Sequence, residues 1–225
     1  MAYARPPVGR AVEVGAGTGK ATRLFAGRGL RVTAVEPDPA MAAVLCRTTG
    51  GLDVEVVPAT LETYVPPDDP YDLLLSASAW HWTDPAVRWD RAAALLRPGG
   101  TVALFDSGRA GSRLRDPALQ EAVVEVRRTV VPDERRATEV RGTSGTWWPG
   151  SEPEEDERFT DVEEHDVERV VRRSRAEHLA VLGTLSAYLV LPERERTDLL
   201  TRIGRRLPDE VEVDANLRLH LARRG

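Results

Sequence analysis

The sequence predicts a doubly wound α/β fold, with a seven-stranded, mostly parallel sheet, a helical insertion and an antiparallel last strand. Over the first half of the 225 residues, short apolar runs alternate with segments of helical spacing, which is typical of a parallel sheet. The first of these runs closes on a glycine-rich turn and the second on an acidic residue. The final apolar segment instead alternates strictly with polar residues, which favours an antiparallel strand.

The first half of the chain is expected to hold five strands, joined by right-handed crossovers. Their predicted ranges are Arg10–Val14, Leu30–Val35, Asp53–Val57, Tyr71–Ser76 and Thr101–Phe105. Helices are predicted at about residues 19–26, 39–47 and 85–96. The last of these helices ends at Arg97-Pro98-Gly99-Gly100, because proline cannot continue a helix and the two glycines favour a turn.

The second half has more helical spacing. A helix is predicted over Leu114–Val131, and a sixth strand lies within Phe159–Val171. Apolar residues at helical spacing predict two further helices, over Glu177–Leu189 and Glu193–Leu207. The segment Val211–Leu221 alternates between apolar and polar residues, so it is expected to form the antiparallel last strand.

The composition excludes several classes of protein. Arginines are interleaved with acids and the net charge is −5, so the chain lacks the basic footprint of a nucleic-acid-binding protein. No apolar run approaches the ~20 residues of a membrane span, and the N-terminus lacks the apolar region of a signal peptide. Cys46 is the only cysteine and the 4 histidines are scattered. We therefore expect a cytoplasmic protein with no metal, no intrachain disulfide, and no contact with nucleic acid or membrane.

The glycine turn after the first predicted strand is the most informative motif. Gly15, Gly17 and Gly19 stand at alternate positions, where missing side chains let the backbone approach a ligand and adopt a positive φ. Glu36 ends the next strand about 20 residues later, where a carboxylate can accept hydrogen bonds from both hydroxyls of a ribose. This order indicates a ribose-bearing cofactor. A dinucleotide is the alternative, although Lys20 occupies the place of the last glycine of G-x-G-x-x-G.

Four motifs together resemble the class I S-adenosylmethionine-dependent methyltransferases. The resemblance is closest to the small-molecule branch that includes the ubiquinone/menaquinone-type and trans-aconitate-type enzymes. The motifs occur in the family's order, at Glu13–Gly19, Glu36–Met41, Ser76–Pro85 and Leu95–Leu104. The resemblance implies a Rossmann-like fold, methyltransferase activity and S-adenosylmethionine as the cofactor. It also implies one domain, with a cofactor-binding half over 1–106, a helical insertion and specificity half over 107–210, and the last strand over 211–225.

By the same resemblance, the glycine turn lines the methionine part of the cofactor, and Glu13 lies near its ammonium group through water. Glu36 binds the ribose. Pro37, Met41 and the loop after the third strand lie around the adenine, and the end of the fourth strand lies under the sulfonium. The cofactor-binding residues implied in this way are Glu13, Gly15, Ala16, Gly17, Thr18, Glu36, Pro37, Met41, Thr60, Leu61, Glu62, Ser76 and Ala77.

Methyl transfer is an in-line displacement at a sulfonium carbon, so much of the catalysis is the positioning of two reactants. His81 is the candidate general base, which is needed only when the nucleophile carries a proton. The alternative, which we favour, is a structural ring packed between Trp80 and Trp82. These two tryptophans are also candidates to bind the acceptor, by walling an apolar cavity or by a cation–π contact with the sulfonium. Tyr188 is the third candidate, because its segment resembles a family helix over the active site.

The expected function is methyl transfer to an oxygen, nitrogen or carbon atom of a small molecule, by a monomer or homodimer. Family members usually carry a helical segment before the glycine motif, whereas the first strand is predicted here from Arg10. This difference leaves open a second function, in which the chain binds S-adenosylmethionine as a non-catalytic regulatory or assembly subunit.

Overall fold

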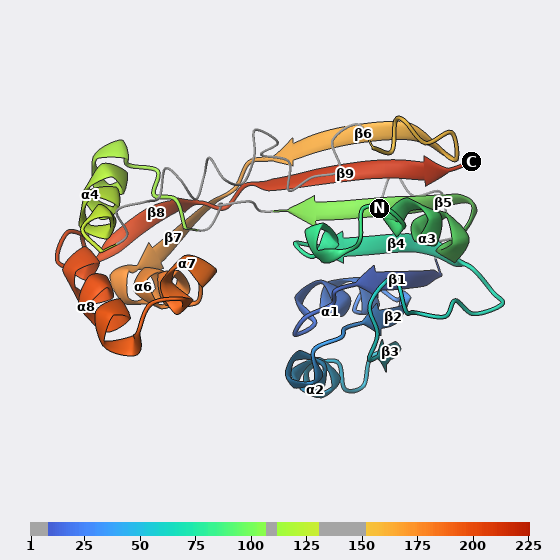
Figure 1. Ribbon diagram of the computed structural model, residues 1–225, viewed down its shortest axis with the longest axis horizontal. Coiled ribbons are helices and arrows are strands. Elements are labelled where there is room, and N and C mark those ends of the chain that lie inside the picture. The colour runs from blue at the N-terminus through green and yellow to red at the C-terminus, as the bar shows by residue number, and fades with distance from the viewer. Residues whose placement is uncertain (1–8, 107–111, 131–151) are drawn as a thin grey trace. The chain divides into compact units, whose positions relative to one another are not determined.

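The computed structural model describes residues 9–106, 112–130 and 152–225 (Figure 1). The described residues form two compact units. The first unit comprises 9–106, 152–165 and 218–225, and the second comprises 112–130 and 166–217. Within these residues no helix is both long and apolar enough to span a membrane.

A seven-stranded sheet with the strand order β3-β2-β1-β4-β5-β9-β6 forms the centre of the first unit (Figure 1). Strands β1 to β5 pair in parallel, and β9 pairs antiparallel with β5, with Thr101 opposite Arg223. The predicted fold class is therefore confirmed. The strands are β1 (Arg10–Val14), β2 (Arg31–Val35), β3 (Val54–Val57), β4 (Tyr71–Ala77), β5 (Leu96–Asp106), β6 (Phe159–Val167) and β9 (Leu217–Arg224).

Both faces of the central strands β1, β2 and β4 are buried, which explains why these strands have nearly continuous apolar runs. Successive residues of a strand point to opposite faces, so Leu73 and Leu75 join one core cluster and Leu74 the other. Helix α1 (Lys20–Ala26) contributes Ala26 to the cluster of Leu73 and Leu75. Helix α3 (Arg88–Leu95) contributes Trp89 to the cluster of Leu74. The two clusters together make the doubly wound arrangement.

Local signals explain where the helices at the carboxyl edge of the sheet begin. Helix α2 (Pro39–Thr48) has proline at its first turn, and Asp38 Oδ1 accepts hydrogen bonds from the backbone nitrogens of Ala40 and Met41 at 2.8 and 2.9 Å. The short 3₁₀ helix η1 (Trp80–Trp82) follows β4 and comes before α3.

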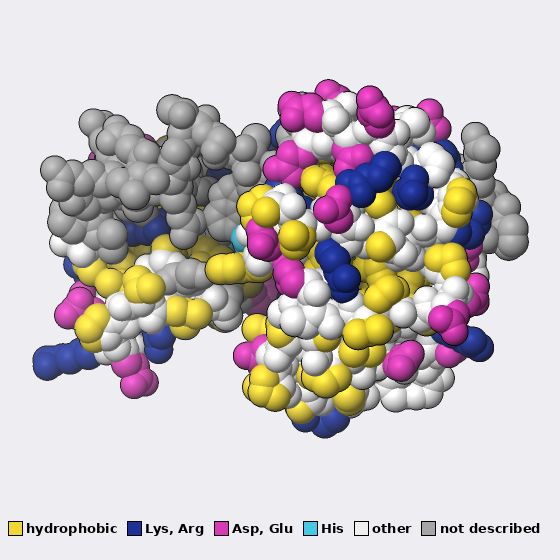
Figure 2. All heavy atoms as spheres, turned by 45° about the vertical axis from the view of Figure 1, so that its right-hand side comes forward, with side chains coloured by type: hydrophobic (Ala, Val, Ile, Leu, Met, Phe, Trp, Pro, Cys, Tyr) yellow, Lys and Arg dark blue, Asp and Glu magenta, His cyan; other side chains and the backbone are white. Residues whose placement is uncertain are grey.

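On the face that Figure 2 shows, acidic and basic side chains are interspersed over the first unit.

The second unit packs its helices against a two-stranded antiparallel sheet. Its core contains Leu182, Tyr188, Leu199, Ile203 and Val213. A capping box begins α6, because Ser174 and Glu177 each bond the other's backbone nitrogen. The elements are α4 (Pro117–Arg128), β7 (Val170–Ser174), α6 (Arg175–Gly183), α7 (Ser186–Leu189), α8 (Glu193–Gly204) and β8 (Glu210–Asp214).

Two predicted strands prove to be pairs of strands. The segment Val211–Leu221 was expected to be one strand, but it divides into β8 and β9, which belong to different sheets. The segment Phe159–Val171 likewise divides into β6 and β7. The two breaks are joined, because the Ala215 nitrogen donates to the Arg169 carbonyl at 2.8 Å and the Arg169 nitrogen donates to Asn216 Oδ1 at 2.9 Å.

Candidate functional site

The three glycines of the turn after β1 all have the positive φ that favours glycine, at 68°, 58° and 83° for Gly15, Gly17 and Gly19. A Cβ on Gly15 would lie 2.3 Å from the Cβ of Ala79, and one on Gly19 would lie 2.6 Å from Leu45 Cδ1. A Cβ on Gly17 would meet nothing within 4 Å. The outer glycines therefore allow close packing, while the middle one stands beside open space.

The glycine turn is held by the end of β2. The backbone nitrogens of Gly15 and Ala16 both donate to the Val35 carbonyl, at 2.9 and 3.1 Å. Glu36 is only 5% exposed, and its two carboxylate oxygens bind different segments. Oε2 accepts from the Gly17 nitrogen at 2.7 Å, and Oε1 accepts from the Asp38 nitrogen at 2.8 Å. The carboxylate is thus immobilised, and each oxygen keeps an acceptor position.

Glu13 is a buried acid on β1, the strand that leads into the glycine turn. Its Oε2 accepts a hydrogen bond from the Thr22 hydroxyl at 2.6 Å. Burial raises the pKa of Glu13 to about 7; the Thr22 hydrogen bond opposes this, and the negative charge of Glu36 adds to it. Near neutral pH the protonated and ionised forms are therefore both populated, and a cation brought close to Glu13 would favour the ionised form.

The end of β4 brings together one predicted and one unpredicted serine. The buried Ser76 hydroxyl donates to the Val14 carbonyl at 2.9 Å, so it ties β4 to β1, and Ala77 follows it half-buried. Ser78 has a φ of 56°, which is uncommon for a residue other than glycine. Its nitrogen donates to the Phe105 carbonyl and its hydroxyl to Asp106 Oδ1, at 2.8 and 3.3 Å. The sequence gives no signal for this turn.

The two tryptophans of η1 have opposite environments. Trp80 is 2% exposed and packs against Trp89, with ring centroids 5.3 Å apart. Trp82 is 82% exposed, and its ring lies 4.9 Å from that of the half-buried His81. The structure therefore places Trp80 in the core and presents His81 and Trp82 together at the surface.

The loop after β3 has one anchored acid. Leu61 is buried in the core, whereas Thr60 and Glu62 are half-buried. Glu62 Oε1 accepts from the Asp84 nitrogen at 2.8 Å. Burial alone would raise the pKa of Glu62, but this bond, the Thr60 side chain and the charge of Arg91 together lower it. Glu62 is therefore ionised and ties the loop to the segment after η1. Two further predicted cofactor residues, Pro37 and Met41, are exposed.

Of the remaining predicted residues, two have not yet been placed, Thr18 and Tyr188. Thr18 is half-buried in the glycine turn. Tyr188 is buried in the core of the second unit, where the guanidinium carbon of Arg127 lies 5.1 Å from the centre of its ring. Among the described residues there is no group of three or more histidine, cysteine, aspartate or glutamate side chains that could hold a metal ion.

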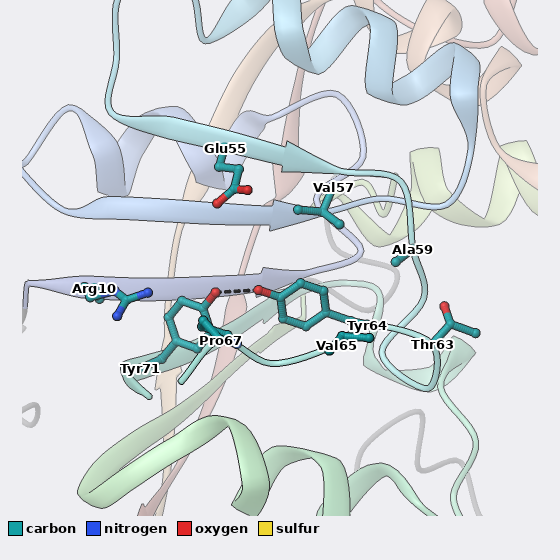
Figure 3. Close-up of a pocket in the computed structure, with 9 residues that line it drawn as sticks. All are labelled: Arg10, Glu55, Val57, Ala59, Thr63, Tyr64, Val65, Pro67 and Tyr71. Atoms are coloured by element: carbon teal, nitrogen blue, oxygen red, sulfur yellow. Dashed lines mark hydrogen bonds between the residues drawn. The ribbon is translucent and has the colours of Figure 1, made fainter. Parts of the chain in front are cut away.

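A groove of about 430 Å³ is lined by residues of β1, β3, β4 and the loop after β3 (Figure 3). The hydroxyls of Tyr64 and Tyr71 meet in it at 2.6 Å, and Tyr71 donates onward to the Thr33 hydroxyl at 3.0 Å. Since Tyr71 uses its proton on Thr33, Tyr64 is the donor to Tyr71. None of the predicted cofactor residues lines this groove. Its lining is Arg10, Glu55, Val57, Ala59, Thr63, Tyr64, Val65, Pro67 and Tyr71.

The chain is similar to known methyltransferases. The family described as a methyltransferase domain matches residues 12–104, which span β1 to β5. Uncharacterized methyltransferases of Mycobacterium tuberculosis and Mycobacterium bovis are each 32% identical to the chain over 199 residues. These alignments cover 86% of the chain and 71% of each relative.

Solved structures show the same fold. A proposed type II methyltransferase from Anaeromyxobacter dehalogenans is 26% identical, with a TM-score of 0.67 over 99% of this chain and 91% of that one. Phosphoethanolamine N-methyltransferase 2 of Haemonchus contortus, solved with S-adenosyl-L-methionine, is 17% identical. Its TM-score is 0.55, over 96% of this chain and 48% of that one, so it supports the fold alone.

Proposed function

The chain belongs to the class I S-adenosylmethionine-dependent methyltransferases, and from this membership we propose that it methylates an oxygen, nitrogen or carbon atom of a small molecule, as a monomer or homodimer. When bound, S-adenosylmethionine supplies a methyl group that is already activated on a sulfonium. The chain's own task is then to bind and orient two reactants. The observation that carries this proposal is the arrangement of Glu36 beside the glycine turn.

Glu36 suits a ribose because it is rigid and can still accept hydrogen bonds. The backbone nitrogens of Gly17 and Asp38 hold one position on each carboxylate oxygen, which leaves one position on each for a pair of neighbouring hydroxyls. The open space beside Gly17 lets a ligand approach the backbone. We assign the ribose to Glu36, and the methionine part of the cofactor to Gly15, Ala16, Gly17 and Thr18.

Glu13 suits the ammonium group of the methionine part. Its carboxyl is buried, its pKa is raised to about 7, and it accepts a hydrogen bond from the Thr22 hydroxyl. A nearby ammonium group lowers the pKa of Glu13, because its positive charge favours the ionised carboxylate. We propose that Glu13 holds this group through a water molecule, as the resemblance implies.

The loop after β3 is proposed to lie against the adenine through Thr60, Leu61 and Glu62, with Pro37 and Met41 on the other side. The hydrogen bond from the Asp84 nitrogen to Glu62 fixes this loop to the segment that follows η1. This hydrogen bond therefore connects the proposed adenine side to the segment that follows His81 and Trp82.

The acceptor is proposed to lie against His81 and Trp82, above Ser76 and Ala77. Trp82 offers an exposed aromatic surface, and the ring of His81 lies against it. In this arrangement His81 positions the acceptor rather than removing its proton. Residues 107–210, with Tyr188 among them, are proposed to select the acceptor, and 1–106 to form the cofactor-binding half.

Calorimetric titration with S-adenosylmethionine, S-adenosylhomocysteine and NADH is the first test. Micromolar binding of the first two and no binding of NADH is expected. A panel of phenols, amines, carboxylic acids and activated carbon acids then serves as acceptors, with S-adenosylhomocysteine formation as the readout. Binding without transfer to any acceptor would favour the non-catalytic subunit, and binding of NADH alone would favour a dehydrogenase.

A further inference from the structure

An ion pair between Arg88 and Glu152 lies beside Trp80, the buried residue of η1. The guanidinium of Arg88, at the start of α3, donates from Nε to Glu152 Oε2 at 2.9 Å, and its Nη2 bonds Oε1. The next residue, Trp89, donates from Nε1 to the same Oε2 at 2.7 Å. The side chain of Arg88 is only 10% exposed, so this charge depends on its partner.

The two residues that bind Glu152 also contact Trp80. The guanidinium carbon of Arg88 lies 6.0 Å from the centre of the Trp80 ring, within the range of a cation–π contact. The Trp89 ring packs against Trp80 at 58°. In contrast, Trp80 Nε1 is buried and has no hydrogen-bond partner among the residues that the structure describes. The orientation of this indole is therefore set by packing, and Arg88 and Trp89 supply that packing on one side.

Trp80 in turn determines where its neighbours point. A 3₁₀ helix has three residues per turn, so the three side chains of η1 project in directions about 120° apart. With Trp80 inserted in the core, His81 and Trp82 must point outward. The hydroxyl of Thr83 donates to the Trp80 carbonyl at 2.7 Å, and Ala79 lies against Gly15. The segment is thus held between the glycine turn and the ion pair.

We propose that Arg88 and Glu152 are positioning residues for the acceptor: they hold Trp80 in the core and so fix the direction of His81 and Trp82. This inference rests on the proposed function, in which His81 and Trp82 contact the acceptor. It makes Glu152, which lies 64 residues from Arg88 in the sequence, part of the support of the active site. Within the described part of the chain, neither side chain forms a hydrogen bond or ion pair with a predicted cofactor-binding residue.

The test uses the full chain labelled with 5-fluorotryptophan and observed by fluorine NMR. The Trp82 signal is assigned as the one that disappears in Trp82→Phe, and the Trp80 signal in the same way. Two mild variants weaken the Arg88–Glu152 ion pair. Arg88→Lys keeps the positive charge but loses the planar guanidinium, and Glu152→Gln keeps the shape of the side chain but loses its charge. Asp90→Asn is the matched control, because Asp90 lies on the same helix, is exposed and pairs with Arg158 at 2.7 Å instead of with Glu152.

Arg88→Lys and Glu152→Gln are both expected to shift and broaden the Trp80 and Trp82 signals, while Asp90→Asn leaves these signals unchanged. The dissociation constant of S-adenosylhomocysteine is expected to change less than threefold. With an acceptor found in the panel, KM is expected to rise tenfold or more, and kcat to change less. A Trp82 signal that stays in place in both variants overturns the proposal, and so does a KM that stays in place when that signal moves.

These outcomes are separate from a failure of the proposed function. If the wild-type chain binds S-adenosylhomocysteine but methylates nothing in the panel, the proposed acceptor class fails. The two fluorine signals still decide whether Arg88 and Glu152 orient the Trp80–Trp82 segment. A loss of S-adenosylhomocysteine binding in Glu152→Gln, with the Trp82 signal unchanged, would place Glu152 on the cofactor side and contradict the inference.

Discussion

The Oε2 atom of Glu36 lies 2.7 Å from the backbone nitrogen of Gly17, so the acid that follows β2 fixes the tip of the turn that follows β1. The same carboxylate holds the Asp38 nitrogen through Oε1. Glu36 therefore shapes the protein side of the site as well as offering acceptors to a ligand. Replacing it should disturb both the turn and the ligand contacts.

Glu36→Ala is expected to weaken S-adenosylhomocysteine binding by about 1–3 kcal/mol, the usual cost of losing hydrogen bonds to a charged group. Calorimetric titration measures this change. Glu55→Ala is the control, because Glu55 is exposed on β3 and lines only the groove of Figure 3. An unchanged dissociation constant in Glu36→Ala would falsify the ribose assignment.

Glu13 should make the ligand-free protein less stable as the pH rises. Burial raises its folded-state pKa from 4.5 to about 7, so between these values the folded state binds more protons than the unfolded state. Stability is then lost progressively from about pH 4.5 to pH 7, by a total on the order of 3 kcal/mol.

Glu13→Gln tests this dependence, because the amide keeps the shape of the side chain and cannot ionise. Its free energy of unfolding should exceed that of the wild type at pH 8, and the difference should largely disappear at pH 5. Denaturant titrations at the two pH values measure it. A constant difference at both pH values would show that Glu13 does not titrate in this range.

The outer and middle glycines of the turn should differ in their tolerance of a methyl group. Gly17→Ala should cost about 1–2 kcal/mol of stability, because only the positive φ opposes it. Gly15→Ala should cost about 1–3 kcal/mol more, because its Cβ would lie 2.3 Å from the Ala79 Cβ. Thermal unfolding of the two variants makes the comparison, and equal losses would contradict the close approach.

His81→Ala should retain measurable methyl transfer if the ring positions the acceptor. The readout is S-adenosylhomocysteine formation in a single turnover with an acceptor from the panel. A general base contributes roughly 10²–10⁴-fold, so a loss of that size or more would instead make His81 the base. His81→Asn, which keeps a polar group without a comparable basicity, separates these roles.

His178 should make the protein sensitive to acid. It is buried in the second unit, and neither ring nitrogen has a hydrogen-bond partner among the described residues. Burial, with the positive charge of Arg173 added, lowers its pKa. Protonation therefore favours the unfolded state, and stability should fall as the pH drops below about 6.5, the ordinary value for histidine.

His178→Leu removes the ionisable group and the unpaired nitrogens together. The variant should lose this acid sensitivity and should be more stable than the wild type at pH 5. Denaturant titrations at pH 5 and pH 7.5 measure the effect. His165→Leu is the control, since that ring is exposed and paired with Glu163. If the two variants respond alike, burial of His178 is not the cause.

Much of the first unit could be predicted because its constraints are local. The turn requires glycines, and the spacing from Gly15 to Glu36 follows from one strand–helix–strand unit. The apolar runs of the central strands reflect burial on both faces. These signals survive in a single sequence, so the fold class and the central strands were within reach of prediction.

The remaining features depend on contacts between distant residues. Trp80 and Trp82 are identical in type and two positions apart, yet the core contacts of Trp89 and Arg88 bury only one of them. The positive φ of Ser78 comes from its bonds to β5. The alternation over Val211–Leu221 continues through the break between β8 and β9, so the pattern itself cannot show that the partner strand changes.

The hydrogen bonds between Arg169 and the pair Ala215–Asn216 have an evolutionary consequence. They join the chain just after β6 to the chain just before β9. Residues 170–214 therefore begin and end at neighbouring points of the backbone. Insertions, deletions or wholesale replacement of that stretch need not alter the register of β9 on β5. Sequence change within residues 170–214 can therefore accumulate over evolutionary time while β9 keeps its pairing with β5.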